Sequence, residues 1–161
     1  MIASRPASPT RRRQISVISG AIFVTLAASV IAWAATPAEI QKQRHEHYEA
    51  LGDAFKAVRD NSRGNPDFAA LDKAMVVIQK STVNQAQWFP KGTGPEAGKT
   101  RALPEIWSKP EEFAAAQKMF TDRAGPLAAA VKARDGEAVG KAFRELGGAC
   151  KNCHDGFRAP E

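Results

Sequence analysis

Apolar side chains recur every three or four positions over most of the chain after residue 36, which is the spacing of one face of an α-helix. No stretch sustains the alternation of apolar and polar residues that a half-buried strand requires. Signals for the start of a helix recur four times. The pattern therefore predicts an all-α protein with four helices, one from Pro37 to about Asp60 and three that begin after Pro66, near Lys109 and after Asp135.

The starts of these helices have recognisable capping sequences. Thr36-Pro37-Ala38-Glu39 and Ser108-Lys109-Pro110-Glu111 have the form of capping boxes with a proline in the first turn, and Asp135 is a capping residue for the last helix. Gly125-Pro126 interrupts the third helix, where we expect a kink or short break. The inward stripes comprise Ile40, Arg44, His47, Tyr48, Leu51, Phe55 and Val58; Phe68, Leu71, Met75 and Ile78; Phe113, Ala116, Phe120, Leu127 and Val131; and Val139, Ala142, Phe143, Leu146, Cys150, Cys153, His154 and Phe157.

The lengths of the connections favour one arrangement of the helices. Short links join the first helix to the second and the third to the fourth, which predicts an antiparallel four-helix bundle of up-down-up-down topology. The middle connection, roughly Phe89 to Trp107, is much longer than usual and contains glycines and prolines. We expect it to cross one end of the bundle on the surface, with Trp88, Phe89 and Trp107 as packing anchors.

The amino-terminal segment has the composition of an export signal. Arg5 and three arginines at positions 11–13 occur without any acidic residue, and an apolar run from Ile15 to about Ala35 follows. The small residues around Trp33 predict cleavage before Ala35, so that residues 1–34 are the signal and residues 35–161 the folded domain. The apolar run is also long enough to span a bilayer, so an uncleaved membrane anchor remains the alternative.

The net charge of the chain depends largely on this segment. The full sequence has 23 basic and 17 acidic residues, and removal of residues 1–34 leaves 19 basic against 17 acidic residues. Nucleic-acid binding requires a concentrated basic stripe, and the remaining chain has none, which argues against nucleic acid as a partner.

The only two cysteines lie in the sequence Cys150-Lys151-Asn152-Cys153-His154. On a helix these three side chains project from one face, so two thiols can add to the vinyl groups of a haem while the imidazole reaches its iron. A zinc site needs about four ligands, and there is no second cysteine pair. The motif therefore predicts one covalently attached haem c per chain, with a dithiol oxidoreductase as the alternative.

Three segments together resemble a known family. They are Arg44 and Tyr48 followed by Ala50-Leu51-Gly52, the phrase from Gly98 to Ala102 that continues through Pro104-Glu105-Ile106-Trp107-Ser108, and the terminal stretch from Cys150 to Arg158. In this order they resemble cytochrome c′, the class II c-type cytochromes, over nearly all of residues 37–158. The resemblance implies a four-helix haem domain, location in the periplasm and often a homodimer.

The resemblance also implies roles for individual residues. Cys150 and Cys153 would form the thioether links, His154 would be the proximal iron ligand, and Arg158 would lie beside its imidazole. Arg44 corresponds to an arginine that approaches a haem propionate. An arginine on an apolar stripe needs such an anion, unless it only extends its stem along the core and keeps its head in water.

Tyr48 corresponds to the family position that covers the distal face of the iron. Tyrosine is not an expected ligand opposite histidine, so the resemblance implies a five-coordinate iron. The phenol either bonds a distal ligand or finds a backbone carbonyl. His47 is placed on the inward side and is an alternative sixth ligand, whereas Met75 and Met119 are expected in the core. We expect His45 to be solvated.

The expected function is that of a periplasmic c-type haem protein with five-coordinate, high-spin iron. It would bind nitric oxide or other small gases such as carbon monoxide, transfer single electrons between periplasmic redox partners, or do both. The alternative is a six-coordinate, low-spin electron carrier with a ligand from the first helix. No residue is evidently placed as a general acid, base or nucleophile, so we do not expect an enzyme.

Overall fold

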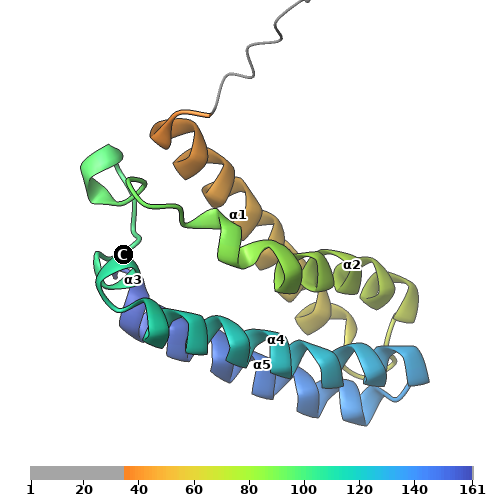
Figure 1. Ribbon diagram of the computed structural model, residues 1–161. Coiled ribbons are helices and arrows are strands. Elements are labelled where there is room, and N and C mark those ends of the chain that lie inside the picture. The colour runs from red at the N-terminus through yellow and green to blue at the C-terminus, as the bar shows by residue number, and fades with distance from the viewer. Residues whose placement is uncertain (1–34, 161) are drawn as a thin grey trace, which may run out of the picture. The chain divides into compact units, whose positions relative to one another are not determined.

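The computed structural model describes residues 35–160, and helices fill most of this range (Figure 1). The prediction of an all-α fold is confirmed. The four long helices are α1 (Pro37–Asn61), α2 (Phe68–Asn84), α4 (Pro110–Ala133) and α5 (Gly136–Phe157).

Successive long helices pack against each other in chain order, α1 on α2, α2 on α4 and α4 on α5 (Figure 1). The links 62–67 and 134–135 are short, as expected, and make the joined helices antiparallel. The long connection contains the 3₁₀ turns η1 (Gln85–Trp88) and η2 (Pro95–Ala97) and the short helix α3 (Glu105–Ser108). It crosses the end of the bundle at which α1 begins and α5 ends (Figure 1).

Three helix starts are capped by side chains. Thr36 and Glu39 form the expected capping box, in which the Thr36 backbone N–H donates to Glu39 Oε2 at 2.6 Å. Asp67 and Asp135 accept hydrogen bonds from the first backbone N–H groups of α2 and α5. The second expected capping box is wrong: Ser108 is the last residue of α3, so α4 begins after Lys109, without a side-chain cap.

Of the kink or short break expected at Gly125-Pro126, the break is wrong, because α4 is continuous from Pro110 to Ala133. Pro126 removes one backbone donor and leaves the Asp122 carbonyl without its usual partner. Both residues are exposed, so water can satisfy that carbonyl. Ala124 and Leu127 are buried on either side and keep the helix packed through this position.

Two apolar clusters fill the bundle. The larger lies in the half remote from the long connection and includes the fully buried Val58, Leu71, Ile78, Leu127 and Leu146. The smaller consists of Ile106, Phe113, Ala116 and Phe157, packed with Phe89 and Trp107.

The proposed export segment, residues 1–34, lies outside the described part of the chain. Within residues 35–160, none of the helices combines the length and the apolar character that a membrane crossing requires.

Candidate functional site

A cavity of about 920 Å³ lies at the end of the bundle where the long connection crosses. Its walls come from the first half of α1, the long connection, the first half of α4 and the last turns of α5. This volume is near the upper end of the range of about 300–1,000 Å³ for small-molecule and cofactor sites. The apolar part of the wall includes Leu51, Phe55, Phe89, Ile106, Phe113, Phe120 and Phe157.

The three side chains of the cysteine–histidine motif all line this cavity. Because they lie at i, i+3 and i+4 on α5, Cys150, Cys153 and His154 project from one face of the helix. Both thiols are half-buried. The helix thus offers two sulfurs and one imidazole to the same space, the donor set that attaches and ligates a haem c.

The electrostatic environment of the motif favours its neutral groups. Burial raises the pKa of Cys150 to about 11, and burial also raises the pKa of Cys153. The pKa of His154 is lowered, first by burial and then by the charges of Arg158 and Arg101. Neutral imidazole is the form that ligates a metal, whereas reactive dithiols have lowered thiol pKa values, the opposite of those found here.

Arg158 lies one helical turn beyond His154, as the sequence predicts. Its Nη1 is 3.5 Å from His154 Nδ1. Its backbone forms an isolated antiparallel bridge with Ala102 of the long connection, and the Ala159 N–H donates to the Arg101 carbonyl at 2.8 Å. These bonds attach the end of α5 to the long connection beside the motif.

Arg44 is buried, with only 4% of its surface exposed, so the alternative that its head reaches water is wrong. Its Nη1 donates to Thr93 Oγ1 at 3.1 Å, and its Nη2 donates to the Thr93 carbonyl at 2.9 Å and to Thr100 Oγ1 at 3.2 Å. The guanidinium carbon lies 4.7 Å from the centre of the Phe89 ring. Arg44 therefore ties α1 to the long connection through neutral acceptors while it also lines the cavity.

The aromatic residues of the long connection are packing anchors, as predicted. Trp107 Nε1 donates to the carbonyls of Phe89 and Pro90, both at 3.1 Å. The Phe89 ring meets Phe113 edge-on with centroids 4.9 Å apart. These contacts, together with the bonds of Arg44, fix the connection against the cavity.

Tyr48 lies on the cavity wall contributed by α1. Its Oη accepts a hydrogen bond from Gln85 Nε2 at 2.9 Å, so its partner is neither a backbone carbonyl nor any group that the sequence suggested. The ring meets Trp88 edge-on with centroids 5.1 Å apart. Burial is the main cause that raises the pKa of Tyr48, so the phenol keeps its proton.

Gln85 is the site residue that sequence reasoning missed. It lies seven positions after Ile78 and so extends the inward stripe of α2 by two turns, which is the signal that could have identified it. Its side chain is buried and lines the cavity beside Tyr48.

His47 is placed against expectation, whereas His45 is exposed, as expected, although it also lines the cavity. His47 is exposed and stacks on Trp88 with ring centroids 4.7 Å apart, outside the cavity lining. His45 lies at the mouth of the cavity, where it also pairs with Glu49 at 3.2 Å. The ring of Trp88, supplied by the long connection, covers His47 on that side of the helix.

The two methionines considered as ligands lie outside the cavity lining. Met75 is buried in the larger apolar cluster, as expected. Met119 is 40% exposed, so its placement in the core is wrong.

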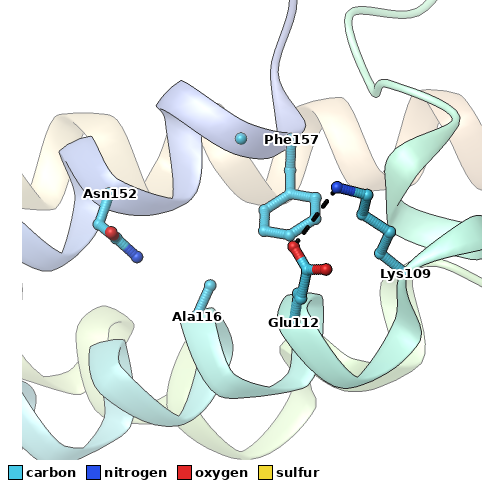
Figure 2. A pocket seen from close by; sticks show the side chains of 6 residues that line it. Lys109, Glu112, Ala116, Asn152 and Phe157 are labelled. Carbon is cyan, nitrogen blue, oxygen red and sulfur yellow. Dashed lines mark ion pairs between the residues drawn. The ribbon is translucent and has the colours of Figure 1, made fainter.

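A second, smaller hollow of about 260 Å³ lies between the start of α4 and the end of α5 (Figure 2). Lys109 and Glu112 form an ion pair of 3.6 Å at its edge, and the Phe157 ring stands beside them. Because neither cysteine lines this hollow, it does not share the chemistry of the large cavity.

Comparisons with known proteins agree with this geometry. The family model described as "Cytochrome C′" matches residues 39–158. Cytochrome c′ of Pararhodospirillum photometricum is 37% identical over 128 residues, which cover 77% of this chain and 99% of the relative. A cytochrome c′ crystal structure described as showing ligand-controlled dimer dissociation matches with a TM-score of 0.73 and 28% identity, over 80% of this chain and all of the other. The nitric oxide complex of a cytochrome c′ variant from Alcaligenes xylosoxidans matches with a TM-score of 0.68, 28% identity and the same coverage.

Proposed function

Because this chain belongs to the cytochrome c′ family, we propose that it binds nitric oxide and other small gases at a five-coordinate, high-spin haem iron. Cytochromes c′ are non-enzymatic haem proteins, and one of the similar structures contains nitric oxide. Carbon monoxide is a second gas of this class. We also propose that the haem exchanges single electrons with redox partners in the periplasm.

The first part of the proposal is one haem c, joined by thioether bonds to Cys150 and Cys153, with His154 as the iron ligand. The observation that carries it is the convergence of these three side chains on one cavity of suitable volume. The raised thiol pKa values support attachment of a cofactor over a dithiol oxidoreductase, whose nucleophile must be a thiolate. When bound, the haem supplies an iron that coordinates diatomic gases and carries one electron.

The charges around the cavity suit a cofactor with two propionates. None of the described residues that line it is Asp or Glu. A buried arginine is costly unless an anion or several hydrogen bonds compensate it, and we propose that Arg44 meets a propionate in addition to its neutral acceptors. The cationic residues of the lining are Lys42, Arg44, Lys99, Arg101 and Arg158.

The proposal of a five-coordinate iron depends on Tyr48. Tyrosine ligates haem iron as phenolate, and the raised pKa of Tyr48 opposes that form. The position of His47 against Trp88 disfavours it as a sixth ligand. The competing function is a low-spin electron carrier with a ligand from α1. In that case His45, which lines the mouth of the cavity, is the better candidate of the two histidines.

Absorption and electron paramagnetic resonance spectra of the purified holoprotein test the proposal. We expect high-spin ferric and ferrous spectra, and a large spectral change when nitric oxide is added to either state. A low-spin, six-coordinate ferrous spectrum before any gas is added would contradict gas binding at an open position. Loss of that low-spin spectrum in His45→Ala would then identify the competing ligand.

We further propose that the chain is exported and dimeric. The family is typically periplasmic, and the composition of residues 1–34 supports cleavage before Ala35. Intact-mass measurement of the native protein tests the proposal of export: a chain starting at Ala35 with the added mass of one haem supports it, and retention of residues 1–34 indicates a membrane anchor.

The proposal of a dimer is supported by the surface of α2. Val76 and Val83 are exposed on this helix, one heptad apart, and offer an apolar face for a second copy.

A further inference from the structure

Gln85 is a buried glutamine that bonds Tyr48 in the cavity of the proposed site. Only 7% of its surface is exposed, and its side chain lines the cavity. Its backbone N–H donates to the Ser81 carbonyl, which fixes the start of η1 on the end of α2. The side-chain amide has little freedom because it is buried and because its Nε2 is hydrogen-bonded to Tyr48.

The hydrogen bond between Gln85 and Tyr48 has a definite direction. Gln85 Nε2 donates, and Tyr48 Oη accepts at 2.9 Å. A phenol has one proton and two lone pairs, so acceptance of this bond uses a lone pair and leaves the O–H proton for another acceptor. Among the described residues, no acceptor for that proton is found. The edge-on contact with Trp88 restrains the ring at the same time.

We propose that Gln85 is a positioning residue that holds the phenol of Tyr48 so that its O–H proton points at a gas molecule bound in the cavity. This inference rests on the proposed gas-binding function and adds the residue that sets the polarity of the distal side. The phenol contacts the gas, and Gln85 acts only through the phenol. Two residues from different segments, α1 and η1, thus form one hydrogen-bonding unit.

The infrared C–O stretching band of the ferrous holoprotein with carbon monoxide tests the proposal. A donor near the gas oxygen draws charge onto it and weakens the C–O bond, so Tyr48→Phe raises the frequency of the band. Gln85→Leu frees the phenol and moves the band in the same direction. From both variants carbon monoxide dissociates about two- to tenfold faster than from the parent protein, which is the change in rate that the loss of one hydrogen bond supports.

A second variant separates positioning from packing. Gln85→Glu has nearly the same shape, but an ionised carboxylate only accepts hydrogen bonds. The phenol O–H therefore donates to the carboxylate and no longer to the gas. At alkaline pH its band therefore shifts as in Tyr48→Phe. Gln87→Leu is the matched control, because Gln87 is exposed in the same 3₁₀ turn and lies outside the cavity lining. Its band stays that of the parent protein.

The combined variant Tyr48→Phe/Gln85→Leu has the band of Tyr48→Phe alone if Gln85 acts through the phenol. A further shift on adding Gln85→Leu would overturn the proposal, because Gln85 would then touch the gas itself. A parent band that Gln85→Leu and Gln85→Glu leave unchanged would overturn it too, while the proposed gas binding stands. Absence of any carbonyl band in the parent protein removes both proposals together.

Discussion

The Arg44 guanidinium donates to both the backbone carbonyl and the hydroxyl of Thr93, at 2.9 and 3.1 Å, across 49 residues of sequence. Thr93 is buried in the long connection, and Thr93 Oγ1 also donates to the Pro90 carbonyl at 2.8 Å. Arg44 thus helps to hold a segment without long helices on the bundle, together with Gln41, whose Nε2 donates to the Thr93 and Gly94 carbonyls at 3.2 and 2.7 Å.

Arg44→Met is expected to lower the free energy of unfolding of the holoprotein by about 2–4 kcal/mol, since hydrogen bonds to a charged group are lost and Thr93 Oγ1 loses the Arg44 donor. Arg44→Lys recovers little of this, because an ammonium cannot reproduce the guanidinium fork. Urea denaturation followed by circular dichroism measures both. Lys56→Met, an exposed change on the same helix and outside the cavity lining, should have little effect. Equal destabilisation by Lys56→Met and Arg44→Met would contradict this account.

The raised pKa of Cys150 predicts slow thiol chemistry in protein without haem. Residues 35–161 with Cys153→Ser, produced without the export signal, carry a single thiol. Because burial, the main cause of the raised pKa of Cys150, is retained in this variant, alkylation by iodoacetamide at pH 8 is expected to be slower than for the same chain in urea.

The raised pKa of Cys150 also makes the free energy of unfolding fall at alkaline pH. The pKa of Cys150 in the folded chain lies above the ordinary thiol value of about 8.5. The contribution of the buried, protonated thiol to the free energy of unfolding is therefore fully present below about pH 8.5. This stability is then lost as the pH rises toward the raised pKa of the folded thiol, because the unfolded chain ionises first. Urea titrations of this variant between pH 7 and 11 measure the loss, with a variant that also carries Cys150→Ser as control. Fast alkylation of the folded chain at pH 8 would favour dithiol chemistry.

Tyr48→Ala is expected to speed the association of carbon monoxide with the ferrous holoprotein, because it removes the ring that covers the proposed gas position. Tyr48→Phe keeps the ring and should leave the association rate close to that of the parent, although it removes the bond with Gln85. Stopped-flow mixing measures both rates. Equal acceleration by the two variants would mean that the hydroxyl, and not the bulk of the ring, limits entry.

The sequence predicted the elements whose cause is local. The spacing of apolar residues located all four long helices, and the capping box at Thr36 is confirmed because its partners lie within one turn. The box at Ser108 failed because α3, a four-residue helix, ends at that residue. Nothing within one turn of Ser108 distinguishes the two cases.

In the site, too, the sequence predicted the arrangements whose cause is local. Cys150, Cys153 and His154 share a helical face by their spacing, and the sequence was sufficient to bring them together. The partner of Tyr48 and the placement of His47 depend on η1, a segment 37 or more residues away, which delivers Gln85 and Trp88 to α1. Contacts of this range come from tertiary packing and have no local signature.

The continuity of α4 through Pro126 allows a stabilising change. Pro126→Ala restores the backbone donor toward the Asp122 carbonyl at an exposed position and should raise the free energy of unfolding by about 1–3 kcal/mol. Gly125→Ala should add about 1 kcal/mol, since a Cβ there meets no atom within 4 Å. Thermal unfolding measures each variant. A loss of stability in Pro126→Ala would show that the helix requires the geometry that proline imposes.

Val76 and Val83 are the exposed large apolar residues of α2, with 66% and 74% of their surfaces accessible. If they form the face for a second copy, a charge there is buried on association and must lose its hydration, which costs more than the contact gains. Val76→Asp/Val83→Asp is therefore expected to sediment as a monomer at concentrations at which the parent holoprotein is a dimer. Met119→Asp is the matched control, because Met119 is also exposed but lies on α4. A dimer that survives the double change on α2 and dissociates with Met119→Asp would place the interface on α4 instead.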